Sequence, residues 1–290
     1  MLDPIARLRR FNRAVTRDVG ALDTSFLGRG RPLGVARVLQ QVTPEGADVA
    51  EIRARLDLDS GLMSRILRGL EAEGLITTAT DAADRRRRIA RLTPTGQTEL
   101  AAYDSIGHDR ARQTLARAPD PAALVAAMDL IATVLNQSHT EIRPADPDSP
   151  QAQYCLRQYF DLLAAKVDAV TPDLFPLPDP HSDSYRPPRG VFLLAWSDGL
   201  PVGCVSLRPL DGATAEVKRL WVAPDARGQG LARRLMAEIE SQARALGYRA
   251  LKLDTNAALT EALSLYRRTG WHETAAYSGF PSTHWFAKTL

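Results

Sequence analysis

The feature that most constrains this chain is a glycine-containing run near its C-terminal end, Arg227-Gly228-Gln229-Gly230-Leu231-Ala232. The stretch before it, residues 215–222, has the composition of a strand, and residues 231–246 after it place apolar side chains at helical spacing. A strand that turns through glycine into a helix leaves backbone N–H groups free at the helix start, where the helix dipole favours negative charge. The pattern therefore predicts a cradle for a pyrophosphate group.

The spacing within this run separates two kinds of phosphate ligand. The dinucleotide fingerprint G-x-G-x-x-G fails, because Arg233 stands where the third glycine would be. The run instead matches the pattern R-x-x-G-x-A through Arg227, Gly230 and Ala232. In this it resembles the loop that binds acetyl-coenzyme A (acetyl-CoA) in the GNAT N-acetyltransferases. The alternative interpretation is an ordinary strand-to-helix turn.

Length and composition limit the class of protein. A chain of 290 residues is expected to form about two domains, and 44% hydrophobic residues suit globular cores. No apolar run approaches the ~18 residues of a membrane span, and the N-terminus has no apolar signal-peptide core. Cys155 and Cys204 provide neither a disulfide framework nor the clustered spacing of a metal site. We therefore expect a cytoplasmic protein with no membrane segment and no bound metal.

The two halves of the chain differ in pattern and in charge. Residues 1–138 predict helices around one short basic excursion, whereas residues 139–290 alternate between strand and helix patterns. The net charge of +3 lies entirely in the first part, which contains 20 arginines and 17 acidic residues. Within the second part, residues 171–188 are rich in Pro, Asp and Ser and predict a long functional loop. The domain boundary is therefore expected between residues 138 and 139.

Residues 59–74 predict a helix, with Asp59 as its N-cap and Gly74 as its stop. One arc of this helix is apolar and would dock it on the domain: Leu62, Met63, Ile66, Leu67 and Leu70. The opposite arc carries hydroxyl and guanidinium groups: Ser60, Ser64, Arg65 and Arg68. Such groups reach phosphates and base edges in the major groove of double-stranded DNA. The helix is therefore a candidate recognition helix.

A β-hairpin with a basic tip follows this helix. Residues 75–80 and 88–92 predict its strands, and four consecutive arginines, Arg85 to Arg88, lie at the tip. Like charges this close repel each other, so the run indicates an anionic partner that would neutralise them. The alternative interpretation is a run of charges exposed to solvent. A hairpin directly after a candidate recognition helix favours DNA as the anion.

Helix and hairpin together resemble the winged helix-turn-helix domain of the MarR family of regulators. The resemblance rests on Met63 to Ile76, on Asp84-Arg85-Arg86 and on Leu92 to Gly96, and it covers about residues 5–138. It implies an all-α domain with a β-wing that binds pseudo-palindromic DNA as a homodimer.

The same resemblance implies roles for two wing residues and for the terminal helices. Arg86 and Arg87 would enter the flanking minor groove. Residues 4–27 and 94–138 would form the dimer interface, with a kink near Pro119.

The second half resembles the GNAT family over about residues 140–290. Besides the cradle, four ordered segments carry the resemblance: Thr140 to Pro144, a hairpin over 191–207, a strand and helix over 251–268, and Gly270-Trp271. The resemblance implies an α/β fold with a central mixed sheet and acetyl-CoA as co-substrate. The residues that would bind acetyl-CoA are Leu220, Trp221, Val222, Arg227, Gly228, Gln229, Gly230, Leu231, Ala232, Arg233, Asn256, Leu259 and Tyr266.

Catalytic roles for three residues also follow from this resemblance. Tyr266 would protonate the leaving thiolate, a transfer that phenol and thiol pKa values of about 10 and 8.5 allow once the site is dry. Asn256 would orient the cofactor or a water, and Glu216, on the predicted central strand, would take a proton from the amine. The alternatives are a packed aromatic, a helix cap and a solvent-facing or arginine-paired carboxylate, respectively. His284 is a second candidate base, with a structural strand histidine as its alternative.

The two halves together predict a bifunctional protein, a transcriptional regulator and an N-acetyltransferase. A bacterial subgroup in which MarR and GNAT domains are fused is similar over residues 216–222 and 283–288. The acceptor is expected to be a small polar amine such as an amino acid, because the loop 171–188 carries charged side chains; a peptide is the other acceptor class. The alternative function is a DNA-binding regulator whose GNAT domain senses acetyl-CoA or a metabolite without catalysis.

Overall fold

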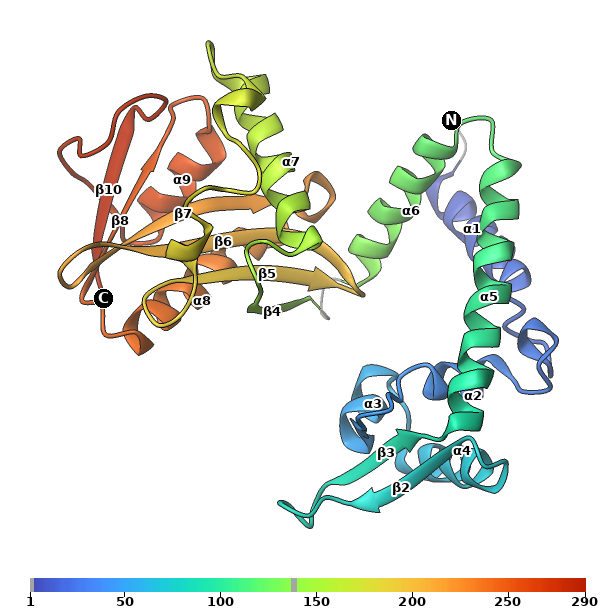
Figure 1. Cartoon of the computed structure of the whole chain (residues 1–290). Helices are drawn as coiled ribbons and strands as arrows, with labels where there is room; N and C mark the ends of the chain where they lie inside the picture. The colour runs from blue at the N-terminus through green and yellow to red at the C-terminus, as the bar shows by residue number, and fades with distance from the viewer. Residues whose placement is uncertain (1–2, 137–139) are drawn as a thin grey trace. The chain divides into compact units, whose positions relative to one another are not determined.

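The computed structural model describes residues 3–136 and 140–290, which form two compact units. The first unit ends at Pro121 and the second begins at Ala122 (Figure 1). The predicted boundary, between Ser138 and His139, lies outside the described residues. Each unit has its own hydrophobic core.

The helices of the first unit follow the periodicity of the sequence. They are α1 (Pro4–Asp18), α2 (Leu33–Leu39), α3 (Val49–Arg55), α4 (Ser60–Ala72) and α5 (Pro94–Ala116), with a 3₁₀-helix, η1 (Phe26–Gly28). Helix α6 (Pro121–Leu135) begins at the boundary between the units, after the break predicted near Pro119. The predicted caps of α4 are confirmed, because Asp59 accepts a hydrogen bond from the Leu62 N–H (2.8 Å) and Gly74 follows the helix with φ of 69°.

A small antiparallel sheet completes the first unit. Its strands β1 (Ala47–Asp48), β2 (Ile76–Thr80) and β3 (Arg88–Leu92) lie in the order β1-β3-β2. The predicted hairpin is confirmed, with Thr80 paired to Arg88 beside the tip. The apolar arc of α4 is buried as predicted except at Leu62, which is 36% exposed because it lies in the first turn, at the edge of the core.

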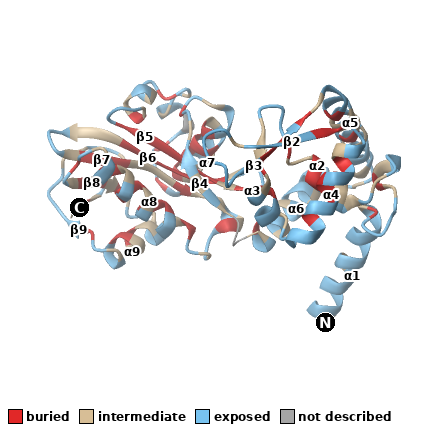
Figure 2. Ribbon diagram, turned by 90° about the horizontal axis from the view of Figure 1, so that it is seen from below, coloured by how far each residue is buried: buried red, intermediate tan, exposed pale blue. Residues whose placement is uncertain are grey.

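Two helices, α1 and α6, carry apolar side chains that are exposed to solvent in the single chain. Helix α1 has no buried residue among those described, and Ile5, Leu8 and Val15 are exposed on it (Figure 2). On α6 the exposed apolar residues are Val125, Met128, Leu130, Val134 and Leu135. Exposed apolar surface of this extent indicates an interaction surface.

The second unit is built on a seven-stranded mixed sheet in the order β4-β5-β6-β7-β8-β10-β9. The strands are β4 (Glu141–Pro144), β5 (Val191–Ser197), β6 (Leu200–Asp211), β7 (Thr214–Val222), β8 (Ala250–Thr255), β9 (His272–Glu273) and β10 (His284–Thr289). Only β7 and β8 pair in parallel among the described strands. The predicted central mixed sheet and its β5–β6 hairpin are confirmed.

Helices cover both faces of this sheet (Figure 1). They are α7 (Pro150–Lys166), α8 (Leu231–Ala245) and α9 (Thr260–Arg268), with the 3₁₀-helices η3 (Pro172–Leu174), η4 (Ser182–Tyr185) and η5 (Pro224–Ala226). On β5, Leu193 and Ala195 share a core with α8 and α9, whereas the alternate residues Phe192 and Leu194 share a core with α7. The period-two alternation of the strand therefore defines an α8 face and an α7 face.

Among the described residues, no single helix is long and apolar enough to cross a membrane. Helices α5 and α6 meet that criterion only when taken together, and they are bent by 120° at the break between them. Within the same residues, no group of three or more His, Cys, Asp or Glu side chains is arranged to hold a metal ion.

Candidate functional site

Strands β7 and β8 pair along only part of their length. Their parallel register runs from Thr214–Ala250 to Glu216–Lys252 and stops there, although β7 continues to Val222 and β8 to Thr255. The strands therefore separate beyond Glu216. The backbone edge of β7 in this opening can offer N–H and C=O groups to a ligand.

A bulge in β7 lies at the opening. Cys204 pairs with Trp221 and Ser206 with Lys218, so β7 has one residue more than β6 over this interval. Arg219 lies within the bulge with φ of 60°, a left-handed conformation that is uncommon for residues other than glycine. Strained backbone of this kind is concentrated at functional sites.

The turn between β7 and α8 leaves the start of α8 without a side-chain cap. Gly230 is the N-cap residue, with φ of 76°, and no side chain accepts a hydrogen bond from the first turn. Gly228 also has a positive φ, 74°, so both glycines are required by the backbone conformation. The free N–H groups and the helix dipole make this end of α8 a suitable site for an anion.

A cavity of about 790 Å³ connects the opening beside β7 with the start of α8. Most of the residues predicted to bind a cofactor line it: Leu220, Trp221, Val222, Arg227, Gly228, Gly230, Leu231, Ala232, Arg233 and Leu259. Gln229 is not in the lining, because its side chain donates a hydrogen bond to the backbone oxygen of Asp225 (3.0 Å). Asn256 and Tyr266 are also absent from the lining.

The cavity has two further walls that the sequence did not predict. Helix α7 contributes Tyr159, Leu162 and Lys166, and α9 contributes Glu261, Ala262, Leu265 and Arg268, with Thr269 after it. The α7 residues lie at helical spacing on one face, which is the only signal the sequence offered. Burial raises the pKa of Tyr159 to about 12, so its hydroxyl keeps its proton at neutral pH.

Tyr266 is buried on α9 in an aromatic cluster. Its ring lies 6.1 Å from the ring of Trp271 and 5.6 Å from that of Phe286, and the residue is 5% exposed. Burial raises the pKa of its phenol well above the usual value of 10. A phenol in these surroundings remains protonated and can act only as a proton donor.

Asn256 has partners for both ends of its amide. Its Nδ2 donates to the backbone oxygen of Pro281 (2.5 Å), and its Oδ1 accepts from the Ala258 N–H (2.9 Å). The first contact joins the end of β8 to the segment before β10, and the second closes a local turn. The N-cap position of α9 is occupied by Leu259, without a side-chain cap, so Asn256 does not cap that helix.

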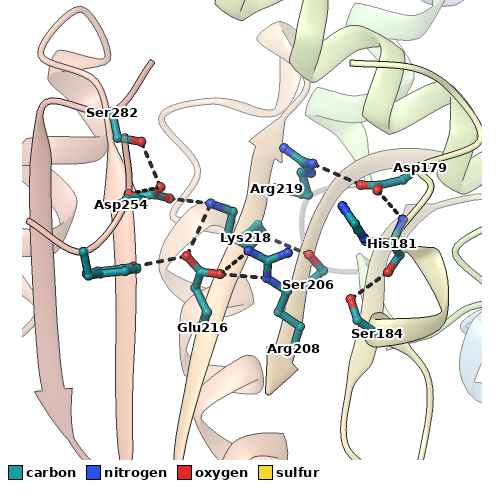
Figure 3. A network of polar contacts seen from close by, with 12 residues as sticks. Asp179, His181, Ser184, Ser206, Arg208, Glu216, Lys218, Arg219, Asp254 and Ser282 are labelled. Carbon is teal, nitrogen blue, oxygen red and sulfur yellow. Dashed lines mark hydrogen bonds and ion pairs between the residues drawn. The ribbon is translucent and has the colours of Figure 1, made fainter. Parts of the chain in front are cut away.

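Glu216 is almost completely buried and paired with two cations (Figure 3). Its Oε2 lies 2.7 Å from Arg208 Nη2, and its Oε1 lies 3.4 Å from Lys218 Nζ. The Tyr277 hydroxyl also donates to Oε1 (3.2 Å). These contacts match the arginine-paired alternative for this residue.

The network extends across the α7 face of the sheet (Figure 3). Lys218 Nζ also lies 2.6 Å from Asp254 Oδ1, and Ser278 and Ser282 donate to Asp254 Oδ2 (2.7 and 2.8 Å). Although burial acts to raise the pKa of Asp254, the Lys218 ammonium and the two hydroxyls hold it below its usual value. His284 lies apart from these carboxylates, on β10, where its Nδ1 is 3.0 Å from Thr283 Oγ1.

In the first unit, α4 presents its polar arc to solvent. Ser60, Ser64, Arg65 and Arg68 are all exposed, whereas Met63, Ile66, Leu67 and Leu70 are buried. Arg68 Nε donates to the backbone oxygen of Ser64 (3.3 Å), which orients its guanidinium along the helix.

The arginines of the hairpin tip divide into two kinds. Arg85 and Arg86 are exposed beyond the strands, but Arg87 Nε lies 2.6 Å from Asp48 Oδ2, the N-cap residue of α3. Arg87, by hydrogen bonding, holds the pKa of Asp48 below its usual value. Arg88 lies 3.6 Å from Glu71 on α4. Arg87 and Arg88 therefore fix the hairpin to the helices, and Arg86 remains available at its tip.

Comparison with known families matches both units. Residues 157–271 match the acetyltransferase (GNAT) family, and residues 30–87 match the MarR family. An IAA acetyltransferase of Azospirillum brasilense is 34% identical over 122 residues, which are 41% of this chain and 80% of that protein. The chain belongs to the GNAT acetyltransferase family. It joins a MarR-family domain to its GNAT acetyltransferase domain.

Other GNAT proteins are similar over the same region. An uncharacterized N-acetyltransferase of Escherichia coli is 28% identical over 131 residues, 43% of this chain and 76% of that protein. A GNAT-family acetyltransferase structure from Staphylococcus aureus covers 52% of this chain and 99% of its own, at 15% identity and a TM-score of 0.45. A GNAT-family structure from Elizabethkingia anophelis with acetyl-CoA bound covers 52% of this chain and 98% of its own, at 21% identity and a TM-score of 0.39.

In this GNAT domain, the cavity and the polar network adjoin different parts of the same strand, β7. The cavity begins at Leu220 to Val222, where β7 is separated from β8, and the network begins at Glu216 and Lys218. A molecule in the cavity and a molecule on the α7 face would therefore approach neighbouring parts of β7.

Proposed function

We propose that the second unit transfers an acetyl group from acetyl-CoA to an amine, and that the first unit binds double-stranded DNA as a homodimer. The observation that carries the transferase proposal is the cavity of about 790 Å³ that joins the opening beside β7 to the uncapped start of α8. It has the two parts that this co-substrate requires, an extended apolar channel and an anion site.

The lining of the cavity fits acetyl-CoA in both shape and charge. Leu162, Leu220 and Leu265 give the channel apolar walls suited to the pantetheine arm. The free N–H groups at Gly230 and the first turn of α8 suit the pyrophosphate. Four basic side chains at the cavity suit its remaining negative charge: Lys166, Arg227, Arg233 and Arg268.

Bound acetyl-CoA would supply an activated acetyl thioester. We assign to Tyr266 the proton that the leaving sulfur needs, because it is a buried phenol on α9, the helix that forms one wall of the cavity. For Glu216 the two ion pairs favour a positioning role, in which the carboxylate holds Arg208 and Lys218. Asn256 would hold the segment before β10 against the end of β8.

The transferase proposal is tested by the release of coenzyme A from acetyl-CoA across a panel of amines, amino acids and basic peptides. Quenching of tryptophan fluorescence reports binding separately, because Trp221 lines the cavity. Turnover with an acceptor supports the proposal. Binding without turnover on any acceptor favours the sensor alternative, and absence of binding contradicts the assignment of the cavity.

For the first unit we infer a winged helix-turn-helix, with α3 and α4 as the helix pair and the β2–β3 hairpin as the wing. Its MarR-family match and the exposed Ser60, Ser64, Arg65 and Arg68 on α4 support recognition of a major groove by this helix. Arg86 would enter the minor groove, whereas Arg87 would hold the wing against Asp48. A second copy would cover the exposed apolar faces of α1 and α6.

Affinity for DNA should fall as salt concentration rises, because arginines that contact phosphates displace counterions. We expect Arg86→Ala to reduce the slope of log affinity against log salt by about 1 per chain. The measurement is fluorescence anisotropy of a labelled random-sequence duplex pool, with two chains expected per bound duplex. Arg37→Ala removes the same charge from an exposed position on α2, outside the predicted helix pair, wing and dimer interface, and is the matched control. An equal effect of both substitutions would contradict the assignment of the wing.

A further inference from the structure

The side chain of Arg219 packs against aromatic rings and pairs with a carboxylate on the α7 face of the second unit. Its guanidinium lies 4.8 Å from the ring centroid of Phe160 and 5.9 Å from that of Phe175, and these two rings are stacked at 4.5 Å. Its Nη2 lies 3.0 Å from Asp179 Oδ2, in the loop between α7 and β5 (Figure 3). The aromatic rings and Asp179 hold the guanidinium in one orientation.

Two hydrogen-bond donors in this environment have no partner in the described part of the chain. They are Arg219 Nε and the hydroxyl of Tyr185, and both atoms are buried. Tyr185 is 1% exposed, and it belongs to the same buried cluster as Phe160, the ring on which the Arg219 guanidinium packs. Leaving a buried donor without a partner is energetically costly, so such groups in native proteins usually meet a water or a ligand.

The charged side chains on this face indicate the charge of a ligand that would bind there. Four cationic side chains lie on the α7 face of β6, β7 and β8: Arg208, Lys218, Arg219 and Lys252. Three carboxylates lie among them in the described structure: Glu216, Asp254 and Asp179. The cluster therefore has one positive charge in excess, and an anion would balance it.

The unpaired donors are also close to the proposed site of acetyl transfer. Arg219 directly precedes Leu220, which lines the cavity, and its guanidinium packs on Phe160, the sequence neighbour of the cavity residue Tyr159. Neither Arg219 nor Tyr185 is part of the cavity lining. A group held by these two donors would therefore lie beside the cavity.

We propose that the acyl acceptor is a free amino acid and that its carboxylate is bound by Arg219 Nε and the Tyr185 hydroxyl. A carboxylate offers two acceptor oxygens for these two donors and supplies the missing negative charge. The amine, one carbon from that carboxylate, would then lie beside the cavity. The proposal rests on the proposed acetyl transfer and adds the substrate class to it.

The test compares each proteinogenic amino acid with its own carboxamide, with coenzyme A release as the readout. The carboxamide keeps the amine and side chain but has no negative charge. We expect the best acceptor to exceed its carboxamide by at least about 100-fold in kcat/KM, as for loss of a charged hydrogen-bonded group. Equal rates for acid and carboxamide would overturn the proposal while leaving the transferase function intact.

Tyr185→Phe removes only one unpaired hydroxyl, so the fold should be kept. We expect it to raise the acceptor KM about 10-fold, as for the loss of one hydrogen bond to a charged group, and to leave the KM for acetyl-CoA unchanged. Tyr103→Phe removes a buried hydroxyl from the core of the first unit and is the matched control. An unchanged acceptor KM in Tyr185→Phe would overturn the proposal.

A binding measurement keeps the test independent of turnover. The same amino acids and carboxamides are titrated calorimetrically into the full-length protein in the presence of coenzyme A, where no acetyl transfer occurs. Binding of an acid but not of its carboxamide supports the carboxylate site even if no acceptor turns over. Absence of amino acid binding, with water satisfying both donors, overturns it.

Discussion

Tyr266→Phe should lower kcat about 10²- to 10⁴-fold, which is the range that a positioned general acid contributes. The KM for acetyl-CoA should change little, because Tyr266 is absent from the lining of the cavity. Phenylalanine keeps the ring contacts with Trp271 and Phe286, so the aromatic cluster and the fold should be preserved. The measurement is steady-state release of coenzyme A with the best acceptor of the panel.

The pH dependence of the same reaction provides a second readout for Tyr266. Burial raises the pKa of this phenol above its usual value of 10, so the acid form is present at lower pH and is lost only as pH rises through the raised value. We therefore expect no alkaline loss of kcat from this group below about pH 10, the unperturbed phenol value. A titration of kcat near neutrality must come from another group.

Tyr248→Phe is the matched control for this substitution. Its hydroxyl donates to the backbone oxygen of Arg189 (2.7 Å), and the residue is not in the cavity lining. It should cost about 1 kcal/mol in stability, as for one hydrogen bond, and leave kcat unchanged. If Tyr266→Phe were as active as Tyr248→Phe, the phenol would be a packing residue of the aromatic cluster.

Local features of the chain could be predicted from the sequence because each depends on nearby residues. Asp59 and Gly74 delimit α4 through contacts within one turn, and the glycines at 228 and 230 supply the positive φ angles of the turn before α8. The hairpin of β2 and β3 follows from its alternation and tip. Such signals need no knowledge of which elements pack together.

Features that depend on packing between distant segments could not be predicted in the same way. The pairing of Arg87 with Asp48 joins residues 39 positions apart, and the pairing of Arg219 with Asp179 joins residues 40 positions apart. A run of arginines therefore gave no indication which of its members would be engaged. The contribution of α7 to the cavity likewise depends on how that helix crosses the sheet.

Glu216→Gln should destabilise the second unit by about 3 kcal/mol, the lower end of the range for breaking a buried ion pair. The substitution keeps the size of the side chain but leaves Arg208 and Lys218 facing a neutral amide. We expect the lower end because the Arg208 side chain is 30% exposed, so that water stabilises part of its charge, and because Lys218 keeps Asp254 as a partner. The free energy lost when a buried carboxylate between two cations is neutralised therefore increases with the burial of those cations.

Urea unfolding followed by tryptophan fluorescence isolates this effect, because all four tryptophans lie in the second unit: Trp196, Trp221, Trp271 and Trp285. Glu240→Gln is the matched control, since Glu240 is also buried but has one cationic partner, Lys288, at 2.7 Å. Its loss of stability should be smaller than that of Glu216→Gln. A stable Glu216→Gln protein whose kcat had fallen about 10²-fold or more would instead identify Glu216 as the base, since this is the range that a general base contributes.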